Sequence, residues 1–143
     1  MSARHFIDTN VFVYSMTSGA PQKTERAEAL IAAAIKTRTG VISYQVVQEF
    51  FNVAFKRFTP AMTLAEAEQY LTTTFRPLLA VHSSNDLFLQ ALRLTATDHL
   101  SWYDSLIVAA ALETECRILY SEDLQNGRRF GELQIRNPFQ QTQ

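Results

Sequence analysis

A repeated alternation between short strand-like segments and longer amphipathic ones restricts the fold of this chain more than any other feature. The strand-like segments lie at 4–7, 41–42, 78–81 and 117–120, and the stretches between them carry apolar residues at helical spacing. Parallel strands need such crossover connections, which are right-handed in nearly all known folds. We therefore expect an α/β fold of three layers, α/β/α, with a short, mainly parallel central sheet.

Local signals mark where the helices begin and end. Thr63 and Glu66 have the spacing of a capping box, and Ser43 is a candidate N-cap for the preceding helix. Residues 11–16 fit either a helical turn or more strand. A loop that contains two glycines leads to a last short strand at 133–135. The expected helices lie at about 23–37, 44–57, 63–75, from 83 or 84 to 97, and 103–114.

Composition indicates one soluble globular domain spanning 1–143. The hydrophobic fraction of 47% is typical of a folded domain. Cys116 is the only cysteine, so an intrachain disulfide and a cysteine-rich zinc site are excluded. Asp8 and Asn10 interrupt the first apolar stretch, which argues against a signal peptide, and no apolar run approaches the ~20 residues of a membrane span. We expect a cytoplasmic protein that does not enter a membrane.

Acidic residues follow two of the expected strands and lie in two of the expected helices. Asp8 directly follows the first strand, and Asp123 closely follows the fourth. Ligands of an open parallel sheet collect outside the carboxyl ends of its strands, so both side chains are expected at one rim. Glu49 lies two turns into the helix after the second strand, among apolar residues, and Asp104 lies in the first turn of the last helix.

Each of these acids also has an ordinary structural explanation. Asp8 can form a turn or cap the next segment. Asp104 stands three residues after Ser101, which is the spacing of a capping box, and an acid is favoured there by the helix dipole. Glu49 and the acidic pair at 122–123 can be solvated charges at the surface. The alternative to these separate roles is a shared site.

Carboxylates gathered at one rim favour metal chemistry. A close pair repels by roughly 3–4 kcal/mol at a surface-like dielectric, and a cation relieves that repulsion. Mg²⁺ and Mn²⁺ prefer carboxylate and water oxygens, and two such ions about 4 Å apart can activate a water and stabilise a leaving oxygen. Phosphodiester hydrolysis suits this arrangement best.

The charge balance permits a nucleic-acid enzyme but not a protein that coats nucleic acid by bulk charge, because the net charge is −1. Without the four acids, 10 acidic residues remain against 13 basic ones, so the remaining surface is expected to be mildly positive.

Four short motifs carry the acids: IDTNV at 7–11, QEF at 48–50, YDSLIVAAA at 103–111 and SEDL at 121–124. In order and spacing they resemble the acidic motifs of PIN-domain ribonucleases, and most closely those of the VapC-type toxins of bacterial toxin–antitoxin pairs. The ending IRNPF at 135–139 is also similar, so the resemblance spans nearly the whole chain. It implies a PIN-like fold, a Mg²⁺- or Mn²⁺-dependent endoribonuclease that hydrolyses RNA phosphodiester bonds, a cognate antitoxin that inhibits it, and a homodimer.

The resemblance also implies roles for individual acids. Asp8, Glu49 and Asp104 match the acidic core of the family. Asp123 matches its fourth acid, and Glu122 is a rival for that position. Asp8 and Asp104 are then expected to bind the principal ion. Glu49 and Asp123 complete its shell or hold a second ion, and a metal-bound water is the nucleophile.

Nearby polar and basic residues complete the expected site. Asn10 and Ser121 match polar residues that support the acids in the family. Arg128 and Arg129 follow Asp123 closely in the sequence and are the preferred contacts for RNA phosphates.

Two other functions stay open at this point. The first is a non-catalytic PIN-like protein that keeps the acidic pocket but only binds RNA or a protein partner. The second is an aspartate-based phosphotransferase, which is less well supported because Asn10 stands where a second acid is expected and no lysine follows Lys56. A nucleotide-binding Rossmann domain is disfavoured because no glycine-rich loop follows the first strand.

Overall fold

A six-stranded sheet forms the centre of the computed structural model, which describes residues 3–140. The strands are β1 (His5–Ile7), β2 (Gly40–Ser43), β3 (Leu79–Val81), β4 (Ile118–Tyr120), β5 (Arg129–Phe130) and β6 (Leu133–Arg136). Their order is β3-β2-β1-β4-β6-β5, and the described pairings are parallel except that of β5 with β6. The prediction of a mainly parallel α/β sheet is confirmed.

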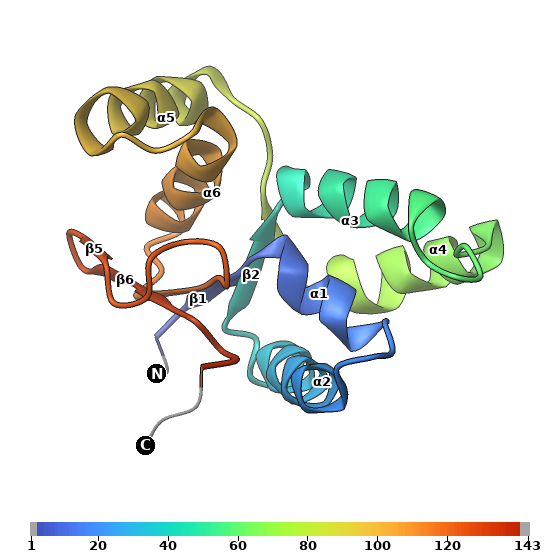
Figure 1. Cartoon of the computed structure of the whole chain (residues 1–143). Helices are drawn as coiled ribbons and strands as arrows, with labels where there is room; N and C mark the ends of the chain where they lie inside the picture. Colours follow the sequence, from blue (N-terminus) through green and yellow to red (C-terminus); the bar gives the residue numbers. More distant parts are fainter. Residues whose placement is uncertain (1–2, 141–143) are drawn as a thin grey trace.

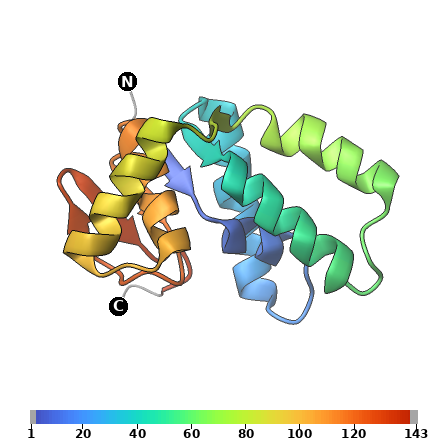
Figure 2. The same cartoon turned by 90° about the horizontal axis from the view of Figure 1, so that it is seen from above.

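Helices cover both faces of this sheet and complete the three layers. In Figure 1, α5 and α6 lie above the sheet and α2 lies below it. Seen from above in Figure 2, α3 and α4 run side by side and extend away from α5 and α6. The helices are α1 (Thr9–Ser15), α2 (Pro21–Thr37), α3 (Tyr44–Lys56), α4 (Leu64–Tyr70), α5 (Asn85–Asp98) and α6 (Trp102–Glu113), and a π-helical segment η1 (Leu71–Phe75) continues α4.

The core fixes the central strands and the last helix most firmly. Phe6 and Ile7 of β1 and Leu119 of β4 are fully buried. Helix α6 is apolar on nearly every side, and residues 105–111 are all buried, as expected for a helix packed inside a domain. Burial of this helix holds the position of its first turn, where Asp104 lies.

Aromatic packing attaches α4 and η1 to α3. The ring of Phe50 stacks on that of Tyr70 with 4.7 Å between centroids, and Phe75 meets both rings edge-on. Burial raises the pKa of Tyr70 to about 12. The part of α3 that carries Glu49 is therefore anchored by the neighbouring, fully buried Phe50.

Three local predictions are resolved by the structure. Residues 11–15 belong to a helix rather than to more strand, since α1 runs from Thr9 to Ser15 and Met16 is its C-cap. The two-residue strand β5 was not expected, because its pairing with β6 depends on the hairpin between them. Ser43 occupies the N-cap position of α3, but its hydroxyl makes no capping hydrogen bond and is buried without a partner. By contrast, the capping box of Thr63 and Glu66 is present.

Within the described residues, no helix combines the length and the apolar character needed to span a membrane.

Candidate active site

Asp8 lies at the junction of β1 and α1, at the carboxyl end of the central strand. Its backbone amide donates to the carbonyl of Tyr120 (3.0 Å), which extends the pairing of β1 with β4. One carboxylate oxygen accepts from the backbone amide of Thr9 (2.7 Å) and so caps α1, and the other accepts from the hydroxyl of Ser121 (2.8 Å). Asp8 is therefore a helix cap, but it is also a buried residue, with a relative exposure of 8%.

The electrostatic surroundings of Asp8 disfavour its negative charge. Burial is the main reason that the pKa of Asp8 is raised to about 6. Hydrogen bonds from Thr9 and Ser121 act in the opposite direction, and the negative charges of Glu49 and Asp123 raise the pKa further. Glu49 and Asp123 thus both lie within electrostatic reach of Asp8, and a bound cation would favour the ionised form of Asp8.

Glu49 is exposed, but neighbouring side chains hold its carboxylate in place. The amide nitrogen of Gln45, one helical turn earlier, donates to one oxygen at 2.7 Å. The hydroxyl of Thr9 donates to the other oxygen in a longer hydrogen bond of 3.4 Å. Because the backbone amide of Thr9 binds Asp8, this one residue connects two of the acids.

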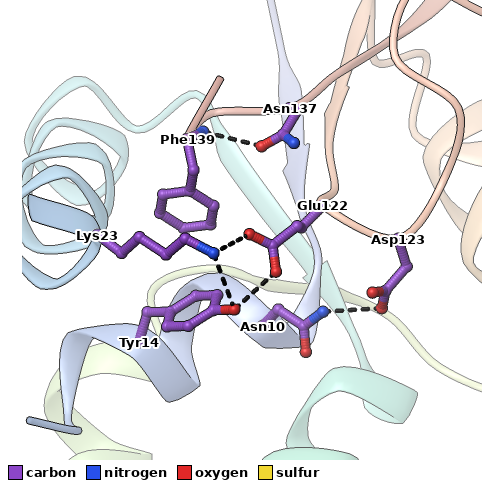
Figure 3. A network of polar contacts seen from close by, with 7 residues as sticks. All are labelled: Asn10, Tyr14, Lys23, Glu122, Asp123, Asn137 and Phe139. Atoms are coloured by element: carbon purple, nitrogen blue, oxygen red, sulfur yellow. Dashed lines mark hydrogen bonds and ion pairs between the residues drawn. The ribbon is translucent and has the colours of Figure 1, made fainter. Parts of the chain in front are cut away.

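The structure separates the two candidates for the fourth acid. Asp123 accepts a hydrogen bond of 2.7 Å from the amide of Asn10, in the first turn of α1 (Figure 3). Glu122 points to the other side, where it pairs with Lys23 at 2.6 Å and accepts from the hydroxyl of Tyr14 at 2.6 Å. The charge of Glu122 is therefore balanced by Lys23, and Asp123 is the acid that faces Asp8.

Asp104 lies in the neighbouring helix and is less closely integrated. Its backbone amide donates to the hydroxyl of Ser101 (3.2 Å), so the predicted cap of α6 is present. Its carboxylate has no hydrogen-bond or ion-pair partner among the described residues. Gln45 connects this turn to α3, because its amide nitrogen also donates to the carbonyl of Tyr103 (3.2 Å).

The two arginines after Asp123 occupy different environments. The guanidinium of Arg128 donates to the carbonyl of Asp98 (3.0 Å), lies 3.5 Å from its carboxylate and stands 4.7 Å above the ring of Phe130. It therefore holds the carboxyl end of α5. Arg129 is exposed on β5.

The donor set fits a hard divalent cation in its chemistry. Asp8, Glu49 and Asp123 offer carboxylate oxygens, and each oxygen engaged by one hydrogen bond retains further acceptor capacity. In residues 3–140, however, no three His, Cys, Asp or Glu side chains are grouped closely enough, as they stand, to hold a metal ion together. Cation binding therefore requires the carboxylates to draw closer.

Sequence reasoning missed the residues that support the acids from within. Gln45 and Thr9 are not ionisable, and the family resemblance implied no role for either of them. The spacing of Gln45 and Glu49, four residues apart on a helix, was a readable signal for their contact. Lys23 lies 99 residues from Glu122 in the chain, and no local pattern reveals that pair.

Comparison with known proteins identifies relatives of this fold. The PIN domain family model matches residues 5–130. Similar solved structures include a toxin–antitoxin complex from Klebsiella pneumoniae, with 17% identity, a TM-score of 0.64 and coverage of 96% of this chain and 98% of that one. A second similar structure is VapC20 of Mycobacterium tuberculosis, a toxin that cleaves the sarcin–ricin loop. It shares 23% identity with a TM-score of 0.62, and the match covers 83% of this chain and 89% of that one. FitAcB from Neisseria gonorrhoeae shares 17% identity with a TM-score of 0.61, and the match covers 94% of this chain and 98% of that one. No curated protein sequence matches significantly.

Proposed function

This chain belongs to the PIN domain family, and from that premise we propose that it is a metal-dependent endoribonuclease that hydrolyses RNA phosphodiester bonds. The observation that carries the proposal is the buried carboxylate of Asp8, whose pKa is raised to about 6 by burial and by two further acids. A cation bound beside Asp8 would relieve the repulsion from these acids, and buried groups with perturbed pKa values are concentrated at functional sites.

Four acids from four segments would hold Mg²⁺ or Mn²⁺. Asp8 and Asp104 are proposed as ligands of the principal ion. Glu49 and Asp123 complete its shell or hold a second ion. When bound, the ion supplies Lewis acidity and lowers the pKa of a water molecule that can attack the phosphorus.

Polar neighbours orient the carboxylates of Asp8 and Asp123. Ser121 and the amide of Thr9 fix both oxygens of Asp8. Asn10 holds the carboxylate of Asp123. These contacts restrict the rotation of the carboxylates before any cation arrives, so less conformational freedom is lost when the ion binds.

RNA and an antitoxin are the proposed partners, in the cytoplasm, and the chain is proposed to act as a homodimeric toxin. The Klebsiella and Mycobacterium structures support this assignment, because one is a toxin–antitoxin complex and the other a toxin that cleaves an RNA loop. Exposed Arg129 is the better candidate of the two arginines for an RNA phosphate, since Arg128 is engaged with Asp98.

Cleavage of RNA by the purified protein tests the proposal. A mixed RNA pool is incubated with Mn²⁺, with Mg²⁺, and with EDTA. We expect cleavage only with a metal, and a loss of more than about a hundredfold in Asp8→Asn, because the partners of ligands alone typically account for 10- to 100-fold. Glu28→Gln, an exposed acid of α2, is the matched control and should cleave normally.

Two results would contradict this function. RNA binding without cleavage under every metal condition would favour a non-catalytic PIN-like binding protein. Normal cleavage by Asp8→Asn would remove Asp8 from the site and with it the basis of the proposal.

A further inference from the structure

Gln45 is a buried polar residue in the first turn of α3, beside the apolar side of the helix. Only 4% of it is exposed, and its neighbours Val46 and Phe50 are fully buried. Its amide nitrogen makes two hydrogen bonds, to the carboxylate of Glu49 (2.7 Å) and to the carbonyl of Tyr103 (3.2 Å). Its amide oxygen is buried without a partner.

The orientation of this amide follows from its partners. Both Glu49 and the carbonyl of Tyr103 are acceptors, and an amide nitrogen carries two protons, one for each. The reverse orientation would direct a carbonyl oxygen at two other oxygens. The observed orientation leaves the oxygen unpaired, which is a cost in stability that an apolar residue of the same size would not carry.

The two hydrogen bonds join the segments that carry two of the proposed ligands. Glu49 lies on α3, and Tyr103 directly precedes Asp104 in the first turn of α6. A single amide group therefore orients one ligand and fixes the backbone beside the other. Within residues 3–140, Gln45 is the side chain that hydrogen-bonds to both segments.

We propose that Gln45 is a positioning residue for the cation site, which links Glu49 to the turn that carries Asp104 and so limits how far these two carboxylates must move to share the ion. The inference rests on the proposed function, since it assigns a role at the same site. Gln45 touches neither the ion nor the RNA in this role, and its loss therefore weakens metal binding while leaving the chemistry at saturating metal largely intact.

Gln45→Leu tests this role, and Gln48→Leu is the matched control. The control makes the same substitution three residues later on the same helix, at an exposed position. Mn²⁺ binding is followed by its quenching of Trp102, the only tryptophan, which lies two residues before Asp104. Cleavage is measured in parallel over a range of Mn²⁺ concentrations, and circular dichroism in EDTA reports the fold.

We expect Gln45→Leu to raise the dissociation constant for Mn²⁺ by about 10- to 100-fold, with kcat near that of the unmodified protein at saturating Mn²⁺. Gln48→Leu should stay within about twofold in both measurements. If Gln45→Leu does not fold, Gln45→Met, which keeps an unbranched chain without a donor, is measured in its place.

The possible failures are distinguishable. Folded Gln45 variants that bind Mn²⁺ as tightly as the unmodified protein, while that protein cleaves RNA, overturn the positioning role alone. A fall in kcat with unchanged dependence on Mn²⁺ also overturns it. An unmodified protein that neither binds Mn²⁺ nor cleaves RNA overturns the proposed function and this role together.

Discussion

Asp8 combines burial with a negative charge, and this determines how it affects stability. The pKa of its carboxyl is about 6 in the folded chain against 3.8 ordinarily, so the folded state binds the proton more tightly than the unfolded state. Its contribution to stability is therefore greatest below pH 4, falls as the pH rises from about 4 to about 6, and stays low above that. Two pKa units correspond to about 3 kcal/mol.

Replacing Asp8 with Asn should remove this pH dependence in the absence of metal. In EDTA, we expect the difference in the free energy of unfolding, Asp8→Asn minus the unmodified protein, to be about 2 kcal/mol larger at pH 7 than at pH 4, because the unmodified protein loses stability over that range. Urea unfolding of both proteins at the two pH values measures the difference. An equal difference at both pH values would mean that Asp8 does not titrate as its burial implies.

At the scale of elements, the segment after β4 connects the proposed site to helices α1 and α2. Asn10 and Tyr14 lie four residues apart on α1 and therefore on one face, and they bind the adjacent acids Asp123 and Glu122 (Figure 3). Lys23 from α2 completes the contact with Glu122. The acid proposed as a ligand is thus held through its neighbour as well as directly.

The hairpin of β5 and β6 offers a contrast between two adjacent arginines. Arg129→Ala should weaken RNA binding for all sequences alike, because it removes one phosphate contact. The slope of the logarithm of the binding constant against the logarithm of the salt concentration should become shallower by about one. Arg128→Ala should instead lower stability by up to about 1 kcal/mol, because its guanidinium holds the end of α5. Fluorescence anisotropy with labelled RNA at several salt concentrations, together with thermal unfolding, separates the two effects. Weaker RNA binding in Arg128→Ala, together with normal binding but lower stability in Arg129→Ala, would contradict these roles.

Sequence patterns predict those elements whose signals are local. The capping residues Thr63 and Ser101 marked helix starts correctly, because a cap is formed within one turn. Ser43 has the same local signal but no cap, since its hydroxyl is buried at the end of β2. Strand β5 escaped prediction because two residues carry too little periodicity.

For the proposed site too, the sequence predicts what depends on local patterns, and the structure is needed for contacts between distant residues. The ends of neighbouring parallel strands meet at one rim, and this rule alone places Asp8 near the segment of Asp123. The choice between Asp123 and Glu122 required the position of Lys23, which no nearby residue reveals. The role of Gln45 required the packing of α3 against the first turn of α6.

For the whole molecule, the proposed ligands come from four segments that span most of the chain: the start of α1, the middle of α3, the start of α6 and the loop after β4. Hydrogen bonds join these segments only when the sheet and its helices are assembled. Unfolding disperses them, so a cation bound by all four stabilises the folded state through simple mass action.

Mn²⁺ should therefore raise the thermal stability of this protein, and only when the acids are intact. At a Mn²⁺ concentration 100 times the dissociation constant, binding to the folded state adds about 2.7 kcal/mol, which corresponds to several degrees in Tm. Asp8→Asn should lose most of this increase, whereas Glu28→Gln should keep it. Thermal unfolding at neutral pH, with Mn²⁺ and with EDTA, measures the shift. Equal shifts in all three proteins would place the bound Mn²⁺ elsewhere on the surface, and the four segments would then not form a shared metal site.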